Sequence, residues 1–434
     1  MKEVRAPQAA LEGLVPYDPK YLPADVLLSA NENPESLPAP VLAQIADGLS
    51  ELACNRYPDP LANGLRDDIA KLWGLERECV LVGNAGDELL FSVALAWGGP
   101  GRTLLTLPPT FSVYETNARL TGTNVECIPR TSAAGLAEAR QAQRTAGVGE
   151  SKCATGVGKA QGTTRDGEAP VAPLEEEPFA VDEQAALDRV SQGDVDYVVL
   201  TSPNNPTGNA TPLDFTERLL DASDALVLVD EAYQEFGGAT AVPLIGQHKN
   251  LVVLRTFSKA YSAAGLRLGY VLAQPDVIRE LIKVRQPYSV DAFSQLVGRA
   301  ILAHKPLFDQ RVRTIVSERD RVYGALRQIE GVTPYPSDAN FLLAQLTATS
   351  ASPEEAPVRS TVAVGGEASS GSAALDDAAA AKAARVWQAL YDQGVLVRDF
   401  SHAPGLTGCL RVSIGTAREN DRFLEVLRQA LQQA

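Results

Sequence analysis

The sequence is poor in the residues that metal sites and disulfide frameworks require. Its 434 residues include only three histidines, which are scattered, and no Cys-x-x-Cys pair. Zinc sites are built from clustered His and Cys ligands, so we expect no metal site. The cysteines are odd in number and far apart: Cys54, Cys79, Cys127, Cys153 and Cys409. This pattern favours reduced thiols, and hence the cytoplasm, over a disulfide-bonded fold.

Long apolar runs and an excess of positive charge are also missing. No stretch of about 18 apolar residues is present, which argues against a transmembrane helix. The first residues, Met1–Arg5, lead into no apolar segment of the kind that secretory signals contain. The formal net charge is −15, which argues against binding nucleic acid or an anionic membrane. An anionic small molecule would instead need a few local arginines and helix N-termini.

The middle of the chain alternates predicted strands and helices. Short apolar runs predict strands at 79–82, 103–107, 125–128, 197–200, 226–229, 251–254 and 267–272. Several are apolar throughout, as strands buried on both faces of a parallel sheet are. The polar residues of interest follow the strand ends, where open α/β sheets bind ligands. We therefore predict a large α/β domain over residues 46–290, preceded by an arm rich in Pro and Asn over residues 1–45.

The C-terminal part predicts a smaller domain over residues 291–434. A long helix is expected near 306–329, strands near 340–343, 395–398 and 409–415, and a final helix from Glu419. These elements indicate an α+β layer. Two segments, 131–178 and 347–382, are rich in Ala and Gly and contain few large apolar residues. Such composition buries little surface, so we interpret both as low-complexity surface insertions without ordered structure.

Lys259 is the most informative single residue. It follows the apolar run 251–254, stands between hydroxyl residues and precedes Gly265-Leu266-Arg267. A buried lysine is costly unless its charge is used or removed. A desolvated amine has a lowered pKa and attacks carbonyl groups. Ser-Lys-Ala alone is nevertheless a weak signal, since an ordinary surface lysine gives the same pattern.

Two further motifs make the pattern specific. Residues 202–208 read Ser-Pro-Asn-Asn-Pro-Thr-Gly after one apolar strand, and Asp230 and Tyr233 follow another. In this order and spacing, together with Lys259 and Arg267, the chain resembles the fold-type I pyridoxal-phosphate aminotransferases. It is most similar to the histidinol-phosphate aminotransferase family, also in the motifs Asn31-Glu32-Asn33-Pro34 and Arg56-Tyr57-Pro58. The resemblance covers nearly the whole chain apart from the two insertions.

The resemblance implies an aspartate-aminotransferase-like fold and pyridoxal 5′-phosphate as the cofactor. Lys259 would hold the cofactor covalently and act as the base, while Asp230 would pair with the pyridinium nitrogen. Asn205 and Tyr233 would donate to its phenolic oxygen. The phosphate group would be held by hydroxyls, by a guanidinium and by the turn that opens a helix: Thr256, Ser258, Arg267, Ala85, Gly86 and Asp87. The last three could equally form a tight turn in which Asp87 caps the helix.

Other residues are implied as cofactor or substrate contacts. Phe111 would stack on the cofactor ring, although a lone aromatic residue is more often part of a core. Tyr57 would reach the cofactor phosphate of a neighbouring subunit, which makes a homodimer with shared active sites the expected assembly. Arg411 would bind the substrate carboxylate, and Arg398 would be a second anion contact or a surface partner of Asp399. Tyr17 and Asn31 could line the substrate pocket.

The expected reaction is transamination of L-histidinol phosphate with 2-oxoglutarate, giving imidazole-acetol phosphate and L-glutamate in histidine biosynthesis. Alternatives are an aromatic amino-acid aminotransferase and a threonine-phosphate decarboxylase on the same scaffold. A non-catalytic regulator would need a basic DNA-binding extension, for which the N-terminus has neither the length nor the charge.

Overall fold

The structure, a computed structural model, describes residues 22–130, 178–347 and 370–433, together with the single residues Arg5, Leu11 and Leu14. In the first turns of the helix that starts at Ser370, only the backbone of residues 370–377 is described. Nearly all of the first expected insertion, most of the second and Tyr17 lie outside the described residues.

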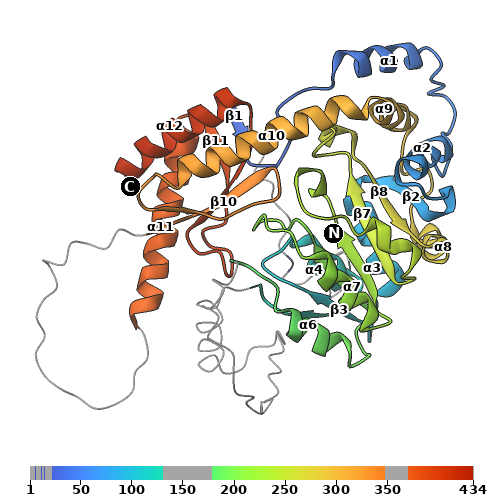
Figure 1. Cartoon of the computed structure of the whole chain (residues 1–434), viewed down its shortest axis with the longest axis horizontal. Helices are drawn as coiled ribbons and strands as arrows, with labels where there is room; N and C mark the ends of the chain where they lie inside the picture. Colours follow the sequence, from blue (N-terminus) through green and yellow to red (C-terminus); the bar gives the residue numbers. More distant parts are fainter. Residues whose placement is uncertain are drawn as a thin grey trace, which may run out of the picture.

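The larger part of the molecule is built around a seven-stranded sheet (Figure 1). Its strands run in the order β2-β8-β7-β6-β5-β3-β4. They are β2 (Val80–Asn84), β3 (Thr103–Thr106), β4 (Asn124–Cys127), β5 (Tyr197–Thr201), β6 (Leu226–Asp230), β7 (Leu251–Thr256) and β8 (Leu268–Ala273). Strands β7, β6, β5, β3 and β4 pair in parallel, and β8 is antiparallel to both of its neighbours. The predicted mostly parallel sheet is therefore confirmed.

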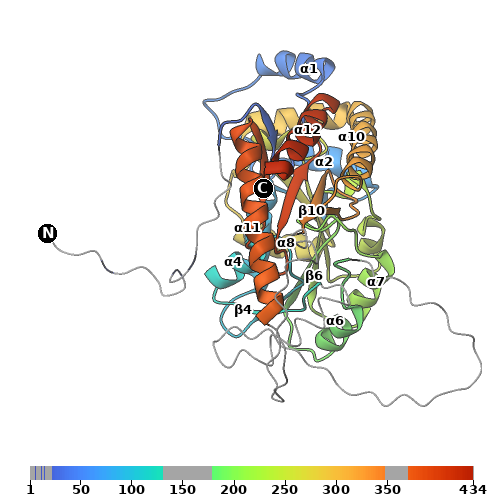
Figure 2. The same ribbon diagram turned by 90° about the vertical axis from the view of Figure 1, so that its left-hand side faces the viewer.

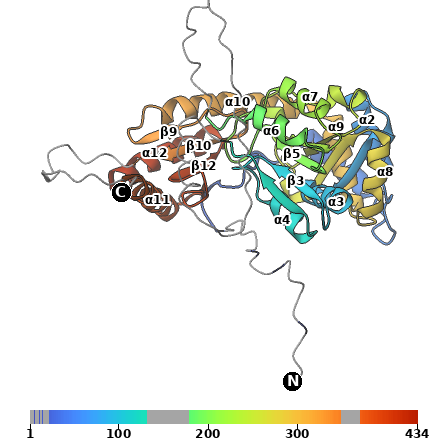
Figure 3. The same cartoon turned by 90° about the horizontal axis from the view of Figure 1, so that it is seen from below.

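Helices cover both faces of this sheet, as the fully apolar strands require. One face packs against α3 (Ala85–Trp97), α4 (Val113–Leu120) and α8 (Pro275–Val284). The other packs against α2 (Asn63–Trp73), α6 (Glu183–Val190), α7 (Leu213–Asp221) and α9 (Ala292–Ala303). Figure 3 shows α6 and α7 on one side of the sheet and α3 and α4 on the other. Short 3-10 turns lie at Arg77–Cys79, Gln234–Phe236, Val242–Gly246 and Ala264–Leu266.

A second, five-stranded sheet lies beside the first in the order β1-β11-β12-β10-β9. Its strands are β1 (Val26–Leu28), β9 (Val332–Pro334), β10 (Phe341–Leu346), β11 (Val395–Asp399) and β12 (Cys409–Ser413). Helices α11 (Ser370–Asp392) and α12 (Ala417–Gln433) pack against each other and against this sheet (Figure 2). Helix α10 (Lys305–Leu326) extends from α9 to the edge strand β9.

Three features differ from the sequence expectations. The arm is not separate from the small sheet, because β1 pairs in parallel with β11, with Val26 opposite Val395. Helix α1 (Ala39–Leu49) and α2 pack against α9, so residues 292–303 join the large sheet's helices. Helix α11 starts within the second expected insertion, because the alanine-rich run before Val386 has a high helix propensity. The domain boundaries after residues 45 and 290 stay predictions.

Among the helices that the structure describes, none is long and apolar enough to cross a membrane. The described residues also contain no group of three His, Cys, Asp or Glu side chains that could hold a metal ion.

Candidate active site

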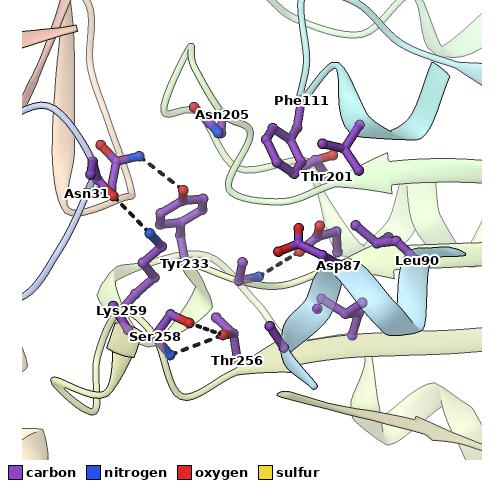
Figure 4. Close-up of a pocket in the computed structure, with 18 of the residues that line it drawn as sticks. Asn31, Asp87, Leu90, Phe111, Thr201, Asn205, Tyr233, Thr256, Ser258 and Lys259 are labelled. Atoms are coloured by element: carbon purple, nitrogen blue, oxygen red, sulfur yellow. Dashed lines mark hydrogen bonds between the residues drawn. The ribbon is translucent and has the colours of Figure 1, made fainter. Parts of the chain in front are cut away.

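A cavity of about 550 Å³ lies at the carboxyl ends of the parallel strands, between the two sheets and the arm. Strand register explains why its residues meet. Thr201 and Asp230 are paired partners at the ends of β5 and β6, and Lys259 follows the end of β7 at Thr256. The volume suits a small organic ligand. Figure 4 shows Phe111 and Asn205 across this pocket from Thr256, Ser258 and Lys259.

Asp230 is a buried carboxylate at the floor of the cavity. It is 4% exposed, and both of its oxygens accept hydrogen bonds: Oδ2 from the Tyr114 hydroxyl at 2.7 Å and Oδ1 from the Ala232 N–H at 3.0 Å. Burial raises the pKa of Asp230 to about 6, against the effect of both hydrogen bonds. A carboxylate in this state is stabilised by a cation placed beside it.

Lys259 extends its amine into the cavity from the opposite side. Its Nζ donates to the Ala30 carbonyl oxygen at 2.9 Å and lies 5.9 Å from the centre of the Tyr233 ring. The side chain is partly open to the cavity, but its ammonium lies deep within the protein. Desolvation, and then the charge of Arg411, lower the pKa of Lys259 to about 8. A fraction of the amine is thus in the neutral, nucleophilic form near physiological pH.

Asn31 determines how Tyr233 is held. Its main-chain N–H donates to the Ser413 hydroxyl at 2.8 Å, that hydroxyl donates to Asn31 Oδ1 at 3.1 Å, and Asn31 Nδ2 donates to the Tyr233 hydroxyl at 3.0 Å (Figure 4). Asn31 is 1% exposed with φ at 54°, a conformation that Asn tolerates better than most residues. Asn31 therefore lines the pocket and also supports the tyrosine.

The N-terminus of α3 forms an anion cradle. The helix begins at Ala85, whose φ is 63°, so Asp87 lies within the first turn and the expected cap position is taken by Asn84. Gly269 of β8 packs closely against this turn. A Cβ atom at Gly269 would lie 2.8 Å from the backbone of Ala85 and would push the turn away. The exposed N–H groups of a helix start favour an anion.

Side chains from two other segments complete the cradle. Arg267 forms an ion pair with Asp87 at 2.5 Å, and the Thr256 hydroxyl donates to Ser258 at 2.9 Å. All four residues line the same cavity as Gly86. Two hydroxyls, a guanidinium and a helix N-terminus are thus gathered where a phosphate monoester would fit.

Phe111 and Asn205 lie on the far wall. Phe111 packs edge-on against Tyr114 with ring centres 5.7 Å apart, and its ring borders the cavity. Asn205 accepts a hydrogen bond from Arg411 Nη1 through its Oδ1, which leaves its amide nitrogen as the group that can donate to a ligand.

Arg411 and Arg398 form the wall contributed by the small sheet. They are directly paired across β11 and β12, so both side chains project from one face of that sheet. Arg411 is 6% exposed, donates to the Ser29 carbonyl at 2.7 Å, and lies between the Phe341 and Phe400 rings at 5.2 and 5.4 Å. Like charges directly opposite each other are unfavourable in a sheet, which favours an anion between them.

Tyr57 is absent from the cavity lining within the described residues. It is 82% exposed and stacks on Tyr288 with ring centres 4.5 Å apart. This position leaves the side chain accessible to another molecule.

Sequence reasoning missed several lining residues. Tyr114 lies three residues after Phe111, and Thr201 directly precedes the Ser202-Pro203 motif, so both could have been found from neighbouring motifs. The carbonyls of Ser29 and Ala30 could not, because any residue supplies a carbonyl. Glu32, from the Asn31-Glu32-Asn33-Pro34 motif, also borders the cavity.

The chain is similar to known proteins over nearly its whole length. The family model described as aminotransferase class I and II matches residues 23–144 and 168–427. Histidinol-phosphate aminotransferase 1 of Carboxydothermus hydrogenoformans is 32% identical over 431 residues, covering 99% of this chain and 100% of that protein.

Two solved structures share the fold. Histidinol-phosphate aminotransferase from Sinorhizobium meliloti, in complex with pyridoxal-5′-phosphate, has a TM-score of 0.74 at 20% identity and covers 99% of both chains. L-threonine-O-3-phosphate decarboxylase from Porphyromonas gingivalis has a TM-score of 0.67 at 22% identity and covers 94% of this chain and 99% of its own. These two likenesses concern the fold alone. They confirm the predicted aspartate-aminotransferase-like architecture.

Proposed function

The chain belongs to the class I and II aminotransferases, which are pyridoxal-phosphate enzymes, and from this premise we propose that it transfers the amino group of L-histidinol phosphate to 2-oxoglutarate. The products are imidazole-acetol phosphate and L-glutamate, which makes it an enzyme of histidine biosynthesis. The observation that supports a phosphorylated substrate is the pair of arginines at the pocket wall, Arg398 and Arg411.

The residues present fit the cofactor. The phosphate would be held by the N-terminus of α3 at Gly86 and Asp87, with Ser258, Thr256 and Arg267 around it. The ring would lie against Phe111. Asp230, buried with a raised pKa, needs a cation beside it, and a protonated pyridine nitrogen is one.

Four side chains have roles in the chemistry. When bound, pyridoxal phosphate supplies an aldehyde that reacts with amines and a ring that accepts electrons. Lys259 holds the cofactor through Nζ at rest, and its freed amine accepts the proton of the substrate's α-carbon. Asp230 keeps the proton at the ring nitrogen. Tyr233, oriented by Asn31, and Asn205 through Nδ2 donate to the phenolic oxygen.

The substrate anions would bind at the small sheet. Arg411 holds the carboxylate of glutamate in one half-reaction and contacts the phosphate of the donor in the other. Arg398 adds the second positive charge that a phosphate dianion needs. The positive charges of these two arginines are needed because the chain as a whole carries a net charge of −15, which repels anionic substrates.

Two further proposals concern the whole protein. We propose a homodimer in which Tyr57 contributes to the cofactor site of the partner, because its side chain is exposed and outside its own cavity. We also propose that the enzyme works in the cytoplasm, which is supported by the free thiols of Cys54, Cys79 and Cys409.

A panel of amino donors with 2-oxoglutarate, followed by glutamate formation, tests the substrate assignment. Histidinol phosphate should be the best donor, and Lys259→Ala should abolish turnover while leaving the fold intact. Phenylalanine as the best donor would replace the proposal with an aromatic aminotransferase. Release of carbon dioxide from threonine phosphate without glutamate would replace it with a decarboxylase.

A further inference from the structure

Tyr114 makes the shortest side-chain contact to Asp230 but has no place in the chemistry described above. It is 3% exposed, and its hydroxyl lies 2.7 Å from Asp230 Oδ2 and 2.9 Å from Thr201 Oγ1. A carboxylate can only accept, so the phenolic proton belongs to the bond with Asp230. Thr201 must therefore donate to Tyr114, and the direction of both hydrogen bonds is fixed.

The surroundings hold this arrangement in place. Thr201 lies opposite Asp230 in the parallel pairing of β5 and β6, and its hydroxyl is 3.2 Å from that of Thr110. The Ala232 N–H occupies the other carboxylate oxygen at 3.0 Å. With one donor on each oxygen, rotation of the carboxylate plane would break a hydrogen bond, so the carboxylate is held in one orientation at the cavity that Asp230 lines.

Tyr114 also supports the opposite wall. Its ring meets the Phe111 ring edge-on, with centres 5.7 Å apart. One residue thus contacts both the carboxylate expected at the ring nitrogen of the cofactor and the aromatic ring expected on its face. Tyr114 makes both contacts from the first turn of α4, which begins two residues after Phe111.

We propose that Tyr114 is a positioning residue, whose hydroxyl orients the Asp230 carboxylate toward the ring nitrogen of pyridoxal phosphate and keeps it ionised there. The inference rests on the cofactor of the proposed function, and it is independent of which amino donor the enzyme uses.

The electrostatics of the neighbouring groups agree with this role. Burial raises the pKa of Asp230, Asp87 and Glu231 raise it further, and the hydrogen bond from Tyr114 lowers it. Burial first, and then the charge of Asp230, raise the pKa of Tyr114 well above its ordinary value. The phenol therefore remains protonated, and it remains a donor, at neutral pH.

The first test uses the cofactor-free protein. Tyr114→Phe keeps the buried ring and removes only the hydroxyl. Tyr197→Phe is the matched control, since this buried tyrosine of β5 pairs with Leu226 at the far end of the strand. The Asp230 carboxyl is titrated by infrared difference spectroscopy against Asp230→Asn. Loss of a hydrogen bond to a charged group should raise its pKa by about one unit in Tyr114→Phe, and the control should leave it unchanged.

The second test compares affinities for pyridoxal phosphate and for an analogue whose ring nitrogen is replaced by carbon. Tyr114→Phe should reduce the preference for the natural cofactor about tenfold, while Tyr197→Phe keeps it. Equal weakening of both ligands, or an unchanged titration of Asp230, would overturn the proposal and leave Tyr114 a packing residue.

A further variant covers the case in which Tyr114→Phe does not fold. Thr201→Val removes the donor to Tyr114 and should shift both measurements in the same direction by a smaller amount. Should the protein bind neither pyridoxal compound, the cofactor assignment fails, but the infrared titration still decides whether Tyr114 controls Asp230.

Discussion

At the scale of single residues, the site contains two ionisable groups whose pKa values are shifted toward neutrality. Burial lowers the pKa of Lys259 to about 8 and raises that of Asp230 to about 6. A pair of groups moved in opposite directions by one cavity is typical of acid–base sites, since each then changes its charge near the working pH. These pKa shifts could be predicted only in part. The sequence indicates a desolvated lysine, but it does not show which groups surround that lysine.

The lowered pKa of Lys259 predicts how fast the cofactor-free protein captures pyridoxal phosphate. Only the neutral amine attacks the aldehyde, so the rate should rise with pH and level off above about 8. Stopped-flow absorbance at a series of pH values measures it. Arg411→Met removes a nearby positive charge and should move the midpoint to higher pH. A midpoint near the ordinary value for lysine in the unmodified protein would contradict the assignment of a desolvated amine.

The raised pKa of Asp230 predicts that the ionised carboxylate lowers the stability of the cofactor-free protein, although the activity requires it. An unfolded Asp titrates near 4 and the folded one near 6, so the ionised carboxylate destabilises the cofactor-free fold increasingly as pH rises through this interval. Asp230→Asn should therefore be more stable above pH 6, by at most about 3 kcal/mol, and equal to the parent below pH 4. Urea unfolding at both pH values measures this.

The same variant should lose most of its activity once loaded with cofactor, because the ring nitrogen loses its counter-charge. Asp47→Asn, an exposed change on α1, is the control and should alter neither property. Near-normal turnover in Asp230→Asn would remove Asp230 from the chemistry.

At the scale of strands and helices, the local pattern predicted most of the large sheet. Runs such as 226–229 and 251–254 form β6 and β7, because apolar, β-branched segments are stable as strands of a sheet that helices cover on both faces. Strand β1 was missed, since three residues carry too little periodicity and its place depends on pairing with β11. The Ala30 carbonyl beside Lys259 follows from that pairing, so it was equally invisible in the sequence.

The pairing of Arg398 with Arg411 predicts how the two arginines divide their work. Arg411→Lys keeps the charge but loses the planar fork, so both half-reactions should weaken by about 1.5–3 kcal/mol. Arg398→Ala should affect the phosphorylated donor more than glutamate, because only the phosphate needs a second positive charge. Single-turnover titration of each half-reaction measures this, with Arg398→Lys as the variant that restores charge. Equal losses for both substrates in Arg398→Ala would contradict the division.

At the scale of the whole molecule, the site is assembled from parts distant in sequence. The cavity is bordered by the arm at Asn31, the large sheet at Asp230 and the small sheet at Arg411. The order of the motifs in the sequence predicted that these residues lie close together, because polar residues that follow the ends of parallel strands lie at one edge of the sheet. Tyr57 is exposed outside the cavity of its own chain, and the apolar side chains Phe91, Leu95 and Phe293 are exposed as well, which supports the proposed dimer.

A subunit-mixing experiment tests whether Tyr57 serves the partner's site. Tyr57→Ala and Lys259→Ala should each be nearly inactive alone. In a hybrid dimer, one site combines the intact lysine of the first subunit with the intact tyrosine of the second, while the other site carries both changes. Random mixing makes about half of the dimers hybrid, each with one working site, so the mixture should recover about a quarter of the parent activity. Parent subunits carrying two different affinity tags, mixed in the same way and captured through one tag, are the control for subunit exchange itself. If Tyr57 instead acts within its own chain, each hybrid contains one site without the tyrosine and one without the lysine, and mixing recovers nothing.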